Sequence, residues 1–122
     1  YHQNRKALPD YYAALEGGQL CVTRGVMLDD DDRLRRHVIM RLVCAQDLDI
    51  AATEARFGIS FKDYFADELT ALAAMVEDGL VEIEPAVIRV REAGRMFLRQ
   101  ICMCFDRYVN RVDHTHRYSR AI

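Results

Sequence analysis

Two short alternating segments on either side of Pro85-Ala86 constrain the fold of this chain most strongly. They read as the strands of an antiparallel β-hairpin. One register places apolar residues opposite each other on one face and opposite charges on the other, as a half-buried ribbon requires. The partners predicted by this register are Val81 with Val90, Glu82 with Arg89, and Ile83 with Ile88.

Helical patterns precede this hairpin. Residues 8–18 predict a short helix, with Pro9 in its first turn, and residues 19–27 are expected to be extended or looped. A second helix begins at the acidic residues 29–32, whose carboxylates can cap backbone amides, and ends near Gln46.

Two further helices are predicted before the hairpin and one after it. Asp49 opens a short helix over residues 50–56, which Gly58 stops, and Ser60 caps a longer helix with Gly79 at its C′ position. The last helix is expected over residues 92–112. The residues expected to face the core along the three longer helices are Leu34, Val38, Leu42, Ala45, Phe61, Phe65, Leu69, Leu72, Val76, Leu98, Ile101, Phe105, Tyr108 and Val112.

This order predicts a mainly α fold with a small β-hairpin, a winged-helix-like helical domain with additional N- and C-terminal helices. The predicted organisation is a linker with a short helix (1–28), the winged-helix-like domain (29–112) and a tail (113–122). Winged helices often bind DNA through the third helix. Here that helix carries one lysine, Lys62, against the acidic residues Asp63, Asp67, Glu68 and Glu77, which would repel phosphates. A DNA-binding regulator is therefore the least favoured function, and no nucleic-acid partner is expected.

Composition limits the remaining classes. With 51% hydrophobic and 30% charged residues, the chain has the make-up of a globular domain and not of a disordered tail. No apolar run reaches the length of a membrane span, so no membrane partner is expected. The start at Tyr1 suits a fragment of a longer protein. Four cysteines without a secretory signal indicate reduced thiols and a cytoplasmic location.

Charge is unevenly distributed along the chain. Residues 1–94 hold 11 Lys/Arg against 17 Asp/Glu, and residues 95–122 hold 6 against 2. Guanidinium groups can hold carboxylates through paired hydrogen bonds. The arginines therefore supply the candidate anion contacts, and on charge grounds Arg24 and Arg36 are predicted to face a substrate. The alternative for every arginine is an ion pair with a nearby acidic residue.

No metal site is predicted. Cys102 and Cys104 lie two positions apart on a helix, so their side chains diverge by about 200° and are expected to pack rather than to share an ion. His114, His116 and Asp113 form only a weak metal-binding pattern. No nucleophile–base pair or Gly-rich phosphate loop stands out, so no catalytic residue is assigned.

Several motifs, in the same order along the chain, resemble the oxygen-independent coproporphyrinogen III oxidase family, radical-SAM enzymes of haem biosynthesis. The resemblance covers essentially the whole chain. The motifs that carry it are Tyr1-His2-Gln3-Asn4, Tyr11-Tyr12, Arg24-Gly25, Arg35-Arg36, Phe61-x-x-Tyr64-Phe65, Asp78-Gly79-Leu80-Val81, Gly94-Arg95, Ile101-Cys102-Met103-Cys104-Phe105-Asp106 and Tyr118-Ser119-Arg120.

The resemblance implies an accessory C-terminal domain. In such an enzyme, a [4Fe–4S] cluster and S-adenosylmethionine are held by an upstream radical-SAM barrel, and two propionates of coproporphyrinogen III become vinyl groups of protoporphyrinogen IX. The radical-SAM signature C-x3-C-x2-C is absent from this chain, so the fragment alone is expected to bind no cofactor and to be inactive. Its expected partners are the barrel and the tetrapyrrole substrate. A haem chaperone built on the same scaffold is the alternative.

Overall fold

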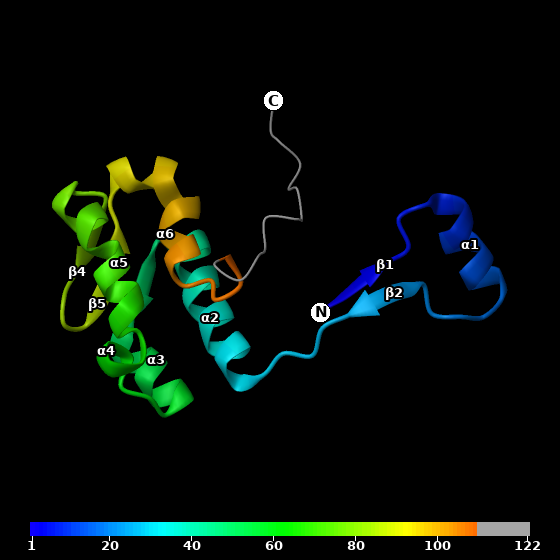
Figure 1. The fold of residues 1–122 in the computed structure, drawn as a ribbon, viewed down its shortest axis with the longest axis horizontal. Helices are drawn as coiled ribbons and strands as arrows, with labels where there is room; N and C mark the ends of the chain where they lie inside the picture. The colour runs from blue at the N-terminus through cyan, green and yellow to red at the C-terminus, as the bar shows by residue number, and fades with distance from the viewer. Residues whose placement is uncertain (110–122) are drawn as a thin grey trace. The chain divides into compact units, whose positions relative to one another are not determined.

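The computed structural model describes residues 1–109 of the chain. These residues belong to two compact units, Tyr1–Arg33 and the part that follows from Leu34 (Figure 1). The tail predicted at residues 113–122, including His114 and His116, lies outside the described residues. The domain boundaries at residues 28 and 112 stay a prediction.

The first unit is a pair of strands connected through a helix. Its elements are β1 (His2–Asn4), α1 (Leu8–Glu16) and β2 (Val22–Gly25), and the two strands pair antiparallel. The predicted helix at residues 8–18 is confirmed, with Pro at its start. The strand at residues 2–4 was not predicted, because three polar residues give no alternating pattern. Ala14 and Cys21 are the buried apolar residues of this unit.

The acidic start of the second helix, α2 (Asp30–Ala45), forms the predicted cap. The Asp32 amide donates to Oδ1 of Asp29 at 2.7 Å, and the Asp29 amide donates to Oδ2 of Asp32 at 3.2 Å. These reciprocal bonds satisfy amides that a helix N-terminus otherwise leaves unpaired. The negative charges of three acidic residues in the first turn also interact favourably with the positive end of the helix dipole.

The second unit has the predicted winged-helix arrangement. A three-stranded antiparallel sheet of order β3-β5-β4 packs with the helices. Strand β3, which was not predicted, contributes the fully buried Leu48 between two aspartates. After α2 the elements are β3 (Asp47–Asp49), α3 (Ile50–Phe57), α4 (Phe61–Tyr64), α5 (Ala66–Glu77), β4 (Val81–Ile83), β5 (Val87–Val90), the 3₁₀ helix η1 (Glu92–Phe97) and α6 (Leu98–Cys104).

The hairpin of β4 and β5 has the register predicted from the sequence. Val81 pairs with Val90, Glu82 with Arg89, and Ile83 with Ile88. The ion pairs across the strands are diagonal. Arg91 contacts Glu82 at 2.9 Å, and Arg89 contacts Glu84 at 3.5 Å.

The helix predicted after Ser60 is interrupted. The Ser60 side chain makes no capping bond, and the Phe61 amide instead donates to Oε1 of Glu54, on α3, at 2.7 Å. The backbone leaves helical geometry at Phe65, which separates α4 from α5. At the other end the prediction is confirmed. Gly79 has φ 70°, and the Leu80 amide donates to the Met75 carbonyl, a Schellman motif.

The last predicted helix, residues 92–112, is wrong in both its start and its continuity. Residues 92–97 form η1, and Gly94 within it lies against the backbone of Leu80. A Cβ on Gly94 would lie 2.1 Å from the Leu80 carbonyl oxygen. Helix α6 ends at Cys104. Just beyond it, the Asp106 side chain accepts a hydrogen bond from the Tyr108 amide at 2.9 Å, which closes a turn.

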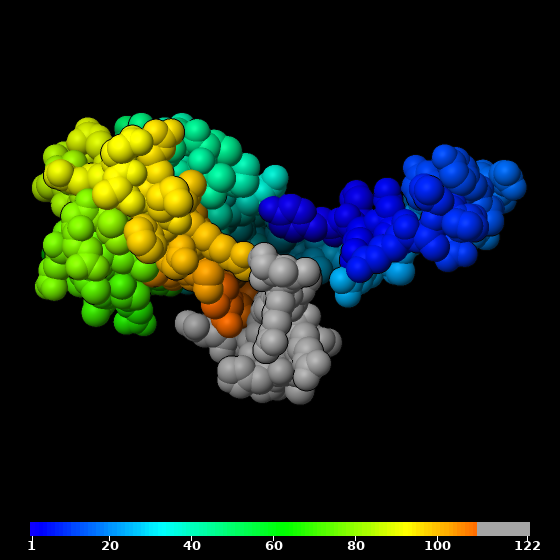
Figure 2. Space-filling view, turned by 90° about the horizontal axis from the view of Figure 1, so that it is seen from above, coloured from blue at the N-terminus to red at the C-terminus, as the bar shows by residue number. Residues whose placement is uncertain are grey.

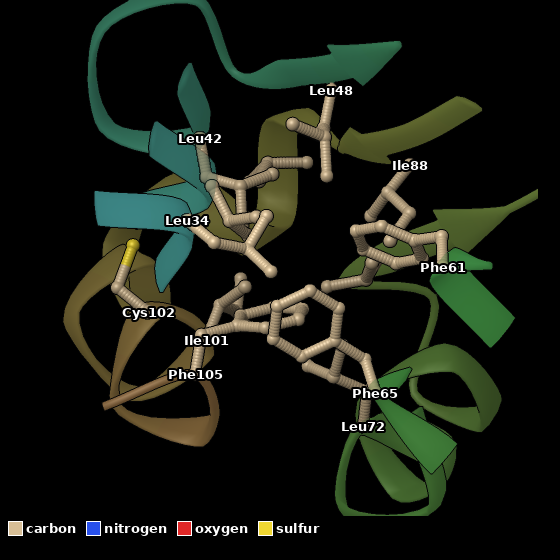
Figure 3. Close-up of a cluster of buried hydrophobic side chains, with 13 residues drawn as sticks. Leu34, Leu42, Leu48, Phe61, Phe65, Leu72, Ile88, Ile101, Cys102 and Phe105 are labelled. Carbon is tan, nitrogen blue, oxygen red and sulfur yellow. The ribbon is translucent and has the colours of Figure 1, made fainter. Parts of the chain in front are cut away.

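The core lies between α2, α5, α6 and the sheet, and Figure 3 shows its side chains converging from these elements. Most of the predicted core residues are buried there. Ala45 and Val76 are instead exposed near the ends of α2 and α5, and Tyr108 is exposed beyond the end of α6. Met75 packs against the core, and the predicted core residue Val112 lies outside the described residues. In the described part of the chain, no helix is long and apolar enough to span a membrane.

Candidate functional site

A basic groove lies on the first unit and is the candidate functional site. Its volume is about 710 Å³. Three cationic side chains line it, Arg5, Lys6 and Arg24, together with one carboxylate, Asp10. Polar and small residues complete the lining: Gln3, Asn4, Ala7, Val22 and Thr23.

The ladder between β1 and β2 determines where these side chains stand. Gln3 pairs with Arg24 in the antiparallel register, and the Arg5 amide donates to the Cys21 carbonyl at 2.9 Å just beyond β1. At the other end, the Tyr1 amino group and the Val26 amide exchange bonds with the opposite carbonyls at 2.9 and 2.8 Å. Backbone pairing therefore brings the basic residues of two separate segments to one groove.

Arg24 is held by a neutral partner. Its Nε donates to Oε1 of Gln3 at 2.7 Å. Within residues 1–109, neither Arg24 nor Arg5 nor Lys6 forms an ion pair with a carboxylate. Other arginines of the chain do, with Arg33, Arg35, Arg41, Arg89, Arg91 and Arg95 each contacting an acidic residue. The groove thus keeps its positive charge, and clustered charges of one sign attract anions more strongly than single ones.

The two arginines predicted to face a substrate lie in different units. Arg24 lines the groove of the first unit, whereas Arg36 is exposed on α2 in the second unit and does not line it. Both assignments stay predictions. Gln3, Arg5 and Lys6 were missed, because only the unpredicted pairing of β1 with β2 brings them to Arg24.

A second groove, between α2 and α6, is largely apolar. It has a volume of about 590 Å³ and includes Arg99 and Asp106 at its edge. Its other lining residues are Ile39, Val43, Leu98, Cys102, Met103 and Val109. Figure 2 shows the surface of η1 and α6, yellow to orange, on which Met96, Phe97 and Met103 are exposed. Exposed apolar surface of this kind is typical of an interface.

The cysteines do not form a metal site in the described part of the chain. Cys102 lies in the core and Cys104 packs against it, as predicted. Burial raises the pKa of the Cys102 thiol to about 11 and also raises the pKa of Cys104. Thiolates are the form that binds metals. No group of three or more potential ligands occurs among the described residues, which therefore do not fit an iron–sulfur cluster.

Comparisons with known proteins agree on one group of relatives. A family model described as the HemN C-terminal domain matches residues 28–97. The chain is 40% identical over 122 residues to the oxygen-independent coproporphyrinogen III oxidase of Escherichia coli K12, and 39% identical over 122 residues to that of Pseudomonas aeruginosa. These matches cover the whole chain but only 27% and 26% of the two relatives.

A solved structure shares the fold. The chain superposes on coproporphyrinogen III oxidase (HemN) from Escherichia coli, described as a radical SAM enzyme, with a TM-score of 0.82 and 42% sequence identity. The match covers 88% of this chain and 25% of that one. The chain thus spans about a quarter of the length of the proteins that it resembles.

Proposed function

Because the chain belongs to the HemN C-terminal domain family, we propose that it is the C-terminal domain of an oxygen-independent coproporphyrinogen III oxidase. The observation that carries this proposal is the 40% identity over all 122 residues to an oxidase of that name. The proposed reaction converts coproporphyrinogen III to protoporphyrinogen IX in haem biosynthesis, in the cytoplasm. Each of two propionates loses a hydrogen atom to a radical and then carbon dioxide, becomes a vinyl group, and passes the remaining electron to an external electron acceptor.

The chemistry of this reaction would belong to the rest of the longer protein. There a [4Fe–4S] cluster with S-adenosylmethionine would supply the radical that removes a hydrogen atom from a propionate chain. The described residues of this domain do not fit such a cluster, since no three potential ligands gather and the Cys102 thiol stays protonated at neutral pH. The domain's own part is to shape the substrate pocket and to exclude water from it.

The apolar groove between α2 and α6 is the proposed docking face for the upstream barrel. The Escherichia coli relative is almost four times as long as this chain, so most of such an enzyme would lie outside this domain. Contiguous exposed apolar surface marks interaction sites, and Val43 and Met103 expose apolar surface at this groove. Arg24 and Arg36 remain the proposed substrate contacts.

The function is tested with the full-length parent protein, reconstituted anaerobically with its cluster and supplied with a reductant for the cluster and an electron acceptor. We expect carbon dioxide release from coproporphyrinogen III that depends on S-adenosylmethionine, with two molecules released per porphyrinogen. A protein that binds haem and releases no carbon dioxide would instead be a haem chaperone. That result would overturn the proposal.

A further inference from the structure

The basic groove contains more positive charge than the first unit neutralises. Arg5, Lys6 and Arg24 line it against the single carboxylate of Asp10, and none of the three forms an ion pair within residues 1–109. An anion that entered the groove would meet three donors with unpaired charge. Arginine and lysine both bind carboxylates, arginine through a planar pair of N–H groups.

The contact between Gln3 and Arg24 prepares the arginine for such a ligand. The Nε–H of Arg24 donates to the side-chain oxygen Oε1 of Gln3 at 2.7 Å, and Gln3 itself is half-buried on the paired strand. The two terminal nitrogens of Arg24 have no acceptor within residues 1–109. A neutral partner orients the guanidinium and leaves its charge in place, whereas an acidic partner would orient it and also cancel its charge.

We propose that this groove binds a propionate carboxylate of the tetrapyrrole, with Arg24, Arg5 and Lys6 as the anion contacts and Gln3 as a positioning residue for Arg24. The inference rests on the proposed function. Coproporphyrinogen III carries four propionates, and protoporphyrinogen IX keeps two of them. An ion pair with a carboxylate that must leave as carbon dioxide would stabilise the ground state and slow its loss. The groove therefore holds a propionate that the product retains.

The experiment uses the full-length, cluster-loaded enzyme and measures carbon dioxide release against porphyrinogen concentration. The variants are Arg24→Gln, Lys6→Gln and Gln3→Glu. Gln3→Glu keeps an acceptor for the Nε–H of Arg24 but neutralises the charge of Arg24. Each is expected to raise KM about tenfold while kcat changes less than twofold, since binding of a retained group is equal in ground and transition states. Arg33→Gln is the matched control, because Arg33 is an exposed arginine of the same unit that does not line the groove. It should leave KM unchanged.

A binding measurement separates this inference from the function on which it rests. Coproporphyrin III and its tetramethyl ester are titrated into the same proteins by fluorescence. Arg24→Gln should weaken binding of the tetra-acid about tenfold and leave binding of the ester unchanged, and added salt should reduce the difference. This binding measurement needs no turnover. A wild-type protein without decarboxylase activity would refute the proposed function, and the titrations would still test whether the groove binds a carboxylate.

Two results would overturn the groove assignment. The first is wild-type KM and wild-type affinity for coproporphyrin III in both Arg24→Gln and Lys6→Gln. The second is a lower melting temperature of these variants with unchanged KM, which would show that these residues contribute to stability and not to substrate binding.

Discussion

Arg35 on α2 and Glu68 on α5 form an ion pair of 2.6 Å in the second unit. Both side chains are mostly buried, with exposed fractions of 16% and 14%. The same Nη1 of Arg35 donates to the Phe105 carbonyl at 3.1 Å, and the guanidinium lies 5.3 Å from the centre of the Phe65 ring. One arginine therefore joins α2, α5 and the end of α6.

Removing this arginine should destabilise the domain. Arg35→Met leaves the Glu68 carboxylate without its partner in a mostly buried place, and we expect a loss of about 2–4 kcal/mol in the free energy of unfolding. The double variant Arg35→Met/Glu68→Leu should recover much of that loss, because no buried charge is left. Urea denaturation of the wild type, Arg35→Met, Glu68→Leu and the double variant measures the coupling. Additive losses in the double variant would show that the pair does not act as a unit.

Gly94 should not tolerate a side chain. The Cβ of Gly94→Ala would lie 2.1 Å from the Leu80 carbonyl oxygen and 3.1 Å from Cγ1 of Val90, so the backbone must move. We expect a cost of about 2–3 kcal/mol from this overpacking. Gly58→Ala is the control. Gly58 has φ 67° with open space around it, so only backbone strain of about 1 kcal/mol is expected there. Equal losses in the two variants would contradict this assignment.

The sequence predicted the elements whose signals are local. The hairpin register followed from alternation over residues 81–90, and Asp49, Gly58 and Gly79 mark helix ends by their own side-chain or backbone chemistry. The break in the last helix could not be predicted in the same way. Gly94 lies against the backbone of Leu80 within this segment, a tertiary contact that no periodicity encodes.

The candidate site shows the same limit more strongly. Arg24 stood out by charge, but Arg5 and Lys6 join it only because β1 pairs with β2. A three-residue polar strand has no alternation of apolar and polar residues from which its pairing could be predicted. Arg35, conversely, is one of a pair of neighbouring arginines in the sequence, and only the fold shows that it bonds to Glu68 in the interior while Arg36 is exposed.

The stability of the second unit should fall in mild acid because of His37. Burial lowers the pKa of His37, and the positive charges of Arg56 and then Arg41 lower it further. His37 therefore takes up a proton more readily in the unfolded chain than in the folded one. Its contribution to the free energy of unfolding is complete above the unfolded pKa of 6.5 and is lost as pH falls through the lower folded pKa. The free energy of unfolding should decline less between pH 7 and pH 5 in His37→Gln than in wild type. Parallel declines would refute the assignment.

Thiol reactivity should distinguish the buried from the exposed cysteines. Cys44 is exposed, whereas Cys102 is buried with a pKa of about 11, so little thiolate is present at pH 8. We expect iodoacetamide to modify Cys44 rapidly in the folded protein and Cys102 only after denaturation. Peptide mass spectrometry over time measures both rates, and Cys44→Ser identifies the fast site. Rapid modification of Cys102 in the folded state would contradict its place in the core.

We propose that this chain is a domain that the oxidase needs for substrate conversion but not for cofactor chemistry. The direct measurement compares the full-length parent with a version truncated before Tyr1, both assayed anaerobically for S-adenosylmethionine cleavage and for carbon dioxide release from coproporphyrinogen III. We predict that the truncated protein still cleaves S-adenosylmethionine and no longer releases carbon dioxide. Carbon dioxide release by the truncated protein at the full-length rate would contradict the account.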